Sequence, residues 1–329
     1  MTDTDNVVNQ RPIQTHVRVG SHRMVLLVRV FGWSTLSILL VFLINNYLSF
    51  WADWPRIVAD EYQSERLLNW MRVGFYVAGV GVASIYVYRN QQCSLHLESR
   101  RISDFNAFLI RAVFWSVLLI GIVDMSLALI EVEQIMEDVF GKALALDLVR
   151  QKFRGQYIHL PLVVLALFIA GLTRSTGFAW LALLLVVVEL LIVMLRYVFS
   201  YEQSYMSDLA RFWYAALFLL ATVDMLREGG HVRVDIFYSK FTPRAKSLVN
   251  ALGALLLGMT FCWVILVIGT AGKFSIFNAA LLSLEKTDTG YGMYVQYFMT
   301  ILLAVYAILM LIQFVSLLFS AVAEYVDAS

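Results

Sequence analysis

Charge, proline and cysteine are all scarce in this sequence. Only 15% of its 329 residues are charged, whereas 60% are hydrophobic, and the mean hydropathy is +0.73. An ordinary soluble domain carries about 25% charged residues and could not hide so many apolar side chains from water. The composition therefore excludes a soluble globular protein, a disordered chain, a coiled coil and a nucleic-acid binder, and it favours a helical membrane protein.

The few cysteines and the balanced charge exclude further classes. Cys93 and Cys262 have no C-x-x-C or other ligand spacing around them, so neither a redox motif nor a metal site is predicted. The formal net charge of +1 indicates no acidic or basic partner. Residues 1–23 are polar, and the first apolar run lacks a small-residue cleavage site, so we expect no signal peptide.

Eight apolar segments approach the length of about 20 residues that a membrane-spanning helix needs. The fourth is the shortest and could instead be re-entrant. We predict an all-α integral membrane protein with about eight transmembrane helices plus interfacial amphipathic helices. The expected spans are 24–49, 70–88, 107–130, 157–172, 177–199, 208–227, 247–272 and 292–322.

The segments between these spans indicate how the chain is oriented in the membrane and which parts lie at the membrane surface. A modest excess of Lys and Arg on one side favours cytoplasmic N- and C-termini. In the 131–156 segment, apolar residues recur at helical spacing from Ile135 to Leu148, which predicts an amphipathic helix in the interface plane. That helix is either a membrane-surface brace or a docking surface for a periplasmic partner. We expect 273–290 to form a polar loop.

Charged residues within the expected spans are functional candidates by default. Arg29 and Arg111 lie near the ends of their segments, from which both can reach the headgroups. Asp224 has Arg227 at i+3, which favours a local pair. Glu189 lies near mid-span, so it is either a polar contact to another helix or part of an ion or proton pathway.

Catalytic signatures are missing from the sequence. It has no Walker A motif, no HExxH, no GxSxG and no histidine pair suited to haem. It also has few of the mid-membrane polar residues and helix interruptions that are typical of transporter cores. We predict neither an enzyme nor a cofactor. Two alternatives stay open, namely a self-sufficient carrier or channel with Glu189, Asp124 and Asp224 lining a path, and a membrane redox subunit.

The most distinctive stretch is 225–246, MLREGGHVRVDIFYSKFTPRAK. Gly229 and Gly230 end the sixth segment in the manner of a helix C-cap. Charged and apolar residues then alternate, and Thr242 with Pro243 opens a new helix as N-cap and first helical residue. The stretch therefore predicts helix, turn, extended segment and helix.

This stretch resembles the REGGH signature of the small membrane subunit of tripartite ATP-independent periplasmic (TRAP) transporters, the DctQ family. The preceding Arg196-Tyr197-Val198-Phe199 is similar to the end of that family's first span, and 207–211, SDLAR, is similar to the start of its second. The resemblance covers about 177–325 and departs at Ser207, where an acid is common. The matching positions are Arg196, Asp208, Arg211, Arg227, Glu228, Gly229, Gly230, His231, Arg233, Asp235 and Pro243.

The resemblance implies a small permease subunit that packs beside a large permease and enlarges its static scaffold. In that family the large permease holds the substrate and sodium sites, and an extracytoplasmic binding protein delivers the solute, typically a carboxylate. It further implies a cytoplasmic N-terminus and the bacterial inner membrane. The expected partners are these two proteins and membrane lipids, with no nucleic acid.

We therefore divide the chain into three parts. Residues 1–23 are a cytoplasmic tail, 24–176 are a four-span N-terminal extension, and 177–329 are a four-span module like the TRAP small permease. We expect Arg227, Glu228, His231, Arg233 and Asp235 to form a polar network at the cytoplasmic membrane surface. The resemblance assigns no role to the extension, which could widen the scaffold or contact the binding protein.

Overall fold

The structure is a computed structural model that describes residues 19–51, 65–175, 177–201, 204–229, 238–272, 274–283, 293 and 295–328. Its described residues form helices and include no strand. Eight helical segments in this part of the chain are long and apolar enough to cross a membrane. The prediction of an all-α membrane protein is confirmed.

The spanning segments follow the expected order along the chain. The fourth has 18 residues and comprises the π-helical turn η1 and the helix α7, and the seventh comprises α11, the π-helical turn η2 and α12. The bounds are α1 Val19–Trp51, α2 Glu65–Arg89, α3 Leu95–Val132, η1 Gly155–His159, α7 Leu160–Leu172, α8 Phe178–Val198, α9 Ser204–Glu228, α11 Pro243–Leu252, η2 Gly253–Met259, α12 Thr260–Thr270 and α14 Val295–Asp327.

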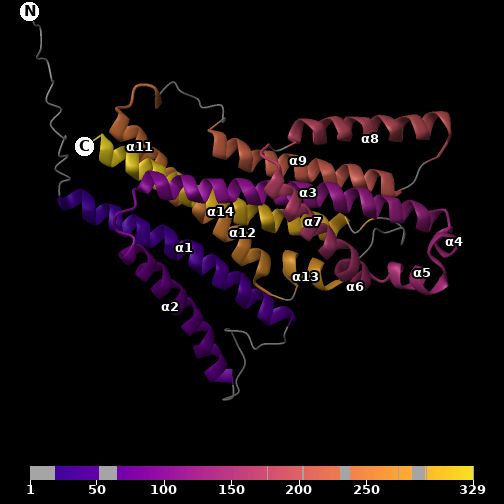
Figure 1. Ribbon diagram of the computed structural model, residues 1–329, viewed down its shortest axis with the longest axis horizontal. Coiled ribbons are helices and arrows are strands. Elements are labelled where there is room, and N and C mark those ends of the chain that lie inside the picture. The colour runs from indigo at the N-terminus through magenta and orange to yellow at the C-terminus, as the bar shows by residue number, and fades with distance from the viewer. Residues whose placement is uncertain are drawn as a thin grey trace, which may run out of the picture.

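Two long helices, α3 and α14, lie side by side through the centre of the molecule (Figure 1). They have 38 and 33 residues, so at 1.5 Å per residue they are about 57 and 50 Å long. The hydrocarbon core of a bilayer is only about 30 Å thick. The central helices are therefore long enough to extend beyond the membrane.

The other helices surround this central pair. α9 packs against both α3 and α14, α7 packs against α3, and α1 packs against α14 and α2. α11, η2 and α12 cover another side of α14. α8 lies at the outer edge of the molecule along α9 (Figure 1). This arrangement leaves α8 as the most peripheral helix of the C-terminal module.

The N-terminal extension and the C-terminal module share one hydrophobic core. Ile110 and Phe114 of α3 belong to the same buried cluster as Leu311 and Phe319 of α14. α3 also approaches α9 closely at Gly121, where an added Cβ would overlap the indole ring of Trp213. Small residues allow such close helix contacts in membranes. The extension is thus an integral part of the bundle.

Buried polar contacts fix the register of α3 against α14. The hydroxyl of Ser99 donates to the carbonyl oxygen of Ser316 at 2.8 Å, and the hydroxyl of Ser316 donates to the carbonyl oxygen of Ser99 at 2.8 Å. The amide of Asn106 donates to the carbonyl oxygen of Leu309 at 3.1 Å and to the side-chain oxygen of Gln313 at 3.0 Å. Sliding one helix along the other would break all four bonds.

Two expectations for the connecting segments are wrong. The 131–156 segment is not one amphipathic helix, because it divides into α4 Met136–Phe140, α5 Lys142–Val149, α6 Gln151–Arg154 and the start of η1. Gly141 separates α4 from α5 with φ +77°, a conformation that favours glycine. The 273–290 segment is not simply a loop, since it contains the helix α13 Ile276–Ser283; residues 284–290 lie outside the described part.

Candidate functional site

The residues singled out from the sequence concentrate on α9 and its neighbours. At the C-terminal end of α9, the guanidinium of Arg227 donates to Asp224 at 2.9 Å and to Glu228 at 2.9 Å. The local Asp224–Arg227 pair expected from the i, i+3 spacing is therefore present. Gly229 follows with φ +68°, as a glycine at a helix C-terminus commonly does.

The remaining residues of the expected polar network lie outside the described residues. These are His231, Arg233 and Asp235, and Gly230 of the same motif also lies outside the described residues. The structure therefore describes only Arg227 and Glu228 of these residues, so the network stays a prediction, and the extended segment expected after the helix is not described.

The helix that follows begins as its sequence predicts. Thr242 is the N-cap of α11, and its side-chain oxygen accepts a hydrogen bond from the backbone nitrogen of Ala245 at 3.3 Å. Pro243 occupies the first helical turn. The guanidinium of Arg244 donates to the carbonyl oxygen of Ala328 just after α14. These contacts attach the start of α11 to the end of α14.

Loss of this cap should weaken α11 locally. We expect Thr242→Ala to destabilise the protein by about 1 kcal/mol, because one backbone N–H of the first turn loses its acceptor. The control is Thr222→Ala on α9, whose hydroxyl bonds only to the preceding turn at Phe218. Unfolding in mixed micelles would measure both variants, and equal stability of the two would contradict the role of the cap.

A second group of motif residues lies at the other end of α9. Asp208 is buried at 1% exposure, and the nearest guanidinium nitrogen of the exposed Arg211 lies 3.9 Å from its carboxylate. Asp208 and Arg227 are 19 positions apart on one helix, or about 28 Å along its axis. The exposed Arg196 lies in the last turn of α8. The predicted motif residues therefore occupy two separate places.

The connection between α8 and α9 makes a contact that the sequence did not indicate. The phenol of Tyr201 donates a hydrogen bond to the carboxylate of Glu133, just after α3, and lies 3.3 Å from the hydroxyl of Tyr205. The hydrogen bond to Glu133 raises the pKa of Tyr201 well above its usual value. The phenol therefore stays protonated and holds the α8–α9 connection to the extension.

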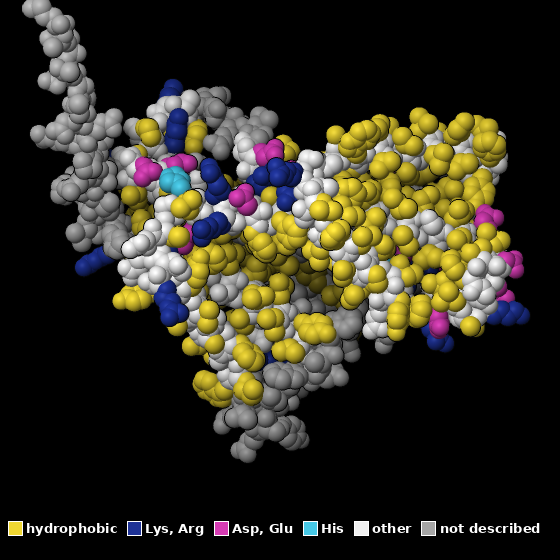
Figure 2. Space-filling view, viewed as in Figure 1, with side chains coloured by type: hydrophobic (Ala, Val, Ile, Leu, Met, Phe, Trp, Pro, Cys, Tyr) yellow, Lys and Arg dark blue, Asp and Glu magenta, His cyan; other side chains and the backbone are white. Residues whose placement is uncertain are grey.

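Glu189 lies on the exposed surface of α8. No hydrogen bond or ion pair joins it to the residues that the structure describes. One side of α8 packs along α9, and its first turn contacts α3 through Phe178 and Phe114, whose ring centroids are 5.5 Å apart. Leu181 is its one buried residue. Figure 2 shows the surrounding surface as almost continuously hydrophobic.

A comparison with known protein families finds a match in the C-terminal part of the chain. Residues 184–324 match the family model described as tripartite ATP-independent periplasmic transporters, DctQ component. This region is a DctQ domain. The match agrees with the resemblance of the sequence motifs to the small membrane subunit of TRAP transporters. Neither the curated proteins nor the solved structures include a match to the chain.

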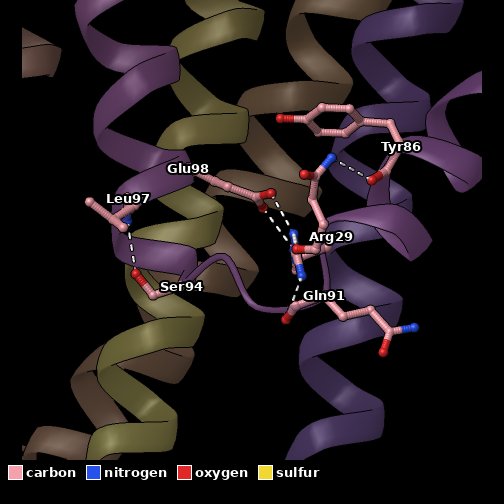
Figure 3. A network of polar contacts seen from close by, with 7 residues as sticks. Arg29, Tyr86, Gln91, Ser94, Leu97 and Glu98 are labelled. Carbon is pink, nitrogen blue, oxygen red and sulfur yellow. Dashed lines mark hydrogen bonds and ion pairs between the residues drawn. The ribbon is translucent and has the colours of Figure 1, made fainter.

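Outside the DctQ domain, the structure corrects the interpretation of Arg29. Its side chain does not reach outward, because it is only 2% exposed and forms an ion pair with Glu98 of α3, itself 1% exposed. Two hydrogen bonds of 2.6 and 2.8 Å join the guanidinium to the carboxylate. It also donates to the carbonyl oxygen of Asn90 at 2.8 Å. Figure 3 shows this network between α1, the α2–α3 turn and α3.

A second buried pair lies within the extension, where it packs against the DctQ domain. His159 of η1 lies 3.0 Å from the carboxylate of Asp124 of α3, with exposures of 14% and 0%. The imidazole packs against Phe298 of α14 at 5.3 Å between ring centroids. Nearby, a guanidinium nitrogen of Arg154, which is fully buried, lies 3.6 Å from the carboxylate of Glu131. Sequence spacing gave no signal for either pair.

The three acids that the carrier hypothesis places along a transport path do not lie together in the structure. Asp124 is paired with His159, Asp224 is paired with Arg227, and Glu189 faces outward from α8. Across the described residues, no three His, Cys, Asp or Glu side chains form a group that could hold a metal ion. Cys93 and Cys262 are not paired with each other.

A polar pocket lies where the extension meets the DctQ domain. Its volume is about 350 Å³. α3, the turn after α7 and the end of α9 all contribute to its wall. The lining residues are Ala107, Arg111, Arg174, Ser175, Asp224, Arg227 and Glu228. Three arginines and two acids thus share a single concavity.

Proposed function

We propose that this chain is the scaffold subunit of a TRAP transporter, which holds the large permease in place while the large permease moves the solute. The DctQ domain supports the assignment as a small permease component. The main structural support for the scaffold role is the outer face of α8. α8 is apolar and exposed around most of its circumference, and Glu189 on it has no partner within the described chain.

Charged side chains of the spans pair with one another inside the chain, which favours a structural role. A translocation path needs polar groups that face a cavity. Here, Glu98 bonds to Arg29, Asp124 bonds to His159, and Asp224 bonds to Arg227. The first two pairs link different helical segments of the same chain, which suits a rigid scaffold better than a moving element, and the third lies within α9.

The remaining parts of the proposal follow from the family. The large permease covers α8, an extracytoplasmic binding protein delivers the solute, and a sodium gradient drives the uptake of a carboxylate. We place the chain in the inner membrane with cytoplasmic termini, where REGGH residues Arg227 to Asp235 form the proposed network. The extension widens the scaffold, a role supported by the core that α3 shares with α14.

Reconstitution tests the function directly. Proteoliposomes that contain this chain and the large permease, supplied with the binding protein and an inward sodium gradient, should accumulate a carboxylate solute. Liposomes with either membrane subunit alone should not. Uptake by this chain alone would overturn the scaffold role and restore the self-sufficient carrier.

Glu189 gives a sharper test of the proposed docking face. A carboxylate that faces lipid costs about 2.5–3.5 kcal/mol, so a hydrogen-bond donor on the large permease should cover it. We expect Glu189→Leu to lower the yield of co-purified large permease by about tenfold, as loss of one charge-assisted hydrogen bond predicts. Glu189→Gln should retain most of the yield, because an amide still forms hydrogen bonds.

The control for this experiment is Val82→Ile on α2, which changes an exposed apolar residue outside the DctQ domain. Its yield should match that of the unmodified chain. A normal yield of complex with Glu189→Leu would show that the large permease binds elsewhere.

A further inference from the structure

The pocket between α3, the α7–α8 turn and α9 contains two arginines that have no acidic partner among the described residues. Arg227 is engaged with both Asp224 and Glu228. Arg111 has a hydrogen bond of 3.4 Å to the carbonyl oxygen of Ala170, and the exposed Arg174 has no interaction with the described residues. With three arginines and two acids the pocket keeps a formal net charge of +1, and Arg111 and Arg174 are its cations that form no ion pair with a described residue.

The position of the pocket is that of a membrane interface. Arg174 lies between two spanning segments, Gly155–Leu172 and Phe178–Val198, so it lies at headgroup level in either orientation of the chain. Leu172 and Trp180 flank it, and both side chains are 71% exposed. Tryptophan at the end of a span commonly sits among the headgroups. Exposed apolar side chains thus lie on both sides of Arg174 along the chain.

We propose that this pocket binds a phosphate group, with Arg111 and Arg174 as the donors. Guanidinium groups donate two parallel hydrogen bonds to phosphate oxygens, and basic pockets between membrane helices bind lipid headgroups. The hydroxyl of Ser175 lines the same pocket and supplies a further donor. An anionic phospholipid fits the site, since its acyl chains would lie along Leu172 and Trp180. A soluble phosphate offers the same phosphate oxygens as hydrogen-bond acceptors but has no acyl chains.

Such a ligand would connect parts of the chain that are far apart in sequence. Arg111 belongs to α3, and Arg174 belongs to the turn after α7, which lines the pocket together with the end of α9. A phosphate between them would complement the positive charge that their junction retains. This proposal concerns the chain alone and does not depend on the large permease, so its failure would leave the scaffold role untouched.

Binding to the purified full-length chain tests the proposal. The probes are phosphatidylglycerol, phosphatidylcholine and inorganic phosphate, added to delipidated protein in detergent and followed by native mass spectrometry. We expect phosphatidylglycerol to bind about tenfold more tightly than phosphatidylcholine, as one net charge-assisted contact predicts. Arg111→Gln/Arg174→Gln should abolish this preference.

Two further variants keep the result interpretable. Arg174→Gln alone changes an exposed side chain, leaves the fold intact and should reduce the preference several-fold. Arg100→Gln/Arg101→Gln removes two exposed arginines of α3 that do not line the pocket, and should change nothing. Binding of inorganic phosphate that is lost in the double pocket variant would support the site and identify a soluble ligand. Lipid preference that survives in both pocket variants, or no binding of any probe, would overturn the proposal.

Discussion

Glu98→Ala should destabilise this protein by about 3–5 kcal/mol, because it leaves the charge of Arg29 buried without a partner. The two side chains are 2% and 1% exposed and share two hydrogen bonds. The variant also removes the carboxylate that orients Arg29 toward the α2–α3 turn, where Arg29 donates to the carbonyl oxygen of Asn90. Unfolding by SDS in mixed micelles would measure the loss.

Two controls separate a buried charge from an ordinary ion pair. Arg29→Met/Glu98→Met removes both charges and should recover most of the stability, since a buried pair often contributes little relative to apolar side chains. Asp147→Ala breaks the surface pair with Arg150, whose side chains are 40% and 74% exposed, and should cost less than about 1 kcal/mol. If Glu98→Ala were as stable as Asp147→Ala, the pair would not be a buried ion pair.

Gly121→Leu should separate the extension from the DctQ domain. The added side chain would overlap the indole ring of Trp213 and approach Leu209, so α3 and α9 would have to move apart. Overpacking of this kind costs about 1–3 kcal/mol. We expect a lower stability in mixed micelles and faster proteolysis in the α8–α9 connection, where Tyr201 would lose Glu133.

The matched control is Gly171→Leu on α7. Gly171 is exposed, and outside the backbone of its own helix no atom lies within 4 Å of a Cβ placed there, so we expect the larger side chain to fit without displacing a neighbour. This variant should unfold like the unmodified protein. Equal behaviour of the two leucine variants would mean that α3 and α9 are not in close contact at Gly121.

Local patterns in the sequence predicted features that depend on nearby residues. Hydropathy located the eight spans, and the spacing of Thr242 and Pro243 predicted the start of α11. The Asp224–Arg227 pair followed from i, i+3 spacing on one helix. Each of these depends on contacts within a few turns, so no knowledge of the packing was needed.

Features that depend on packing were not predictable in this way. Arg29 and Glu98 are 69 positions apart, and hydropathy alone suggested that Arg29 would reach toward the headgroups. His159 and Asp124 are 35 positions apart and face each other only because α7 packs on α3. Arg111 and Arg174, which form no ion pair with a described residue, line one pocket only because the α7–α8 turn lies beside α3 and α9.

The pairing of α3 with α14 has a consequence for biosynthesis. Ser99 and Ser316 are 217 positions apart, so α3 enters the membrane long before its main partner has been translated. During that interval, the buried face of α3, including Asn106, must be covered by lipid, by α1 and α7, or by the insertion machinery. A ribosome that stalls before α14 would leave the preceding spans in the bilayer with Ser99 and Asn106 of α3 lacking their hydrogen-bond partners on α14, and such a fragment is a natural substrate for membrane quality-control proteases.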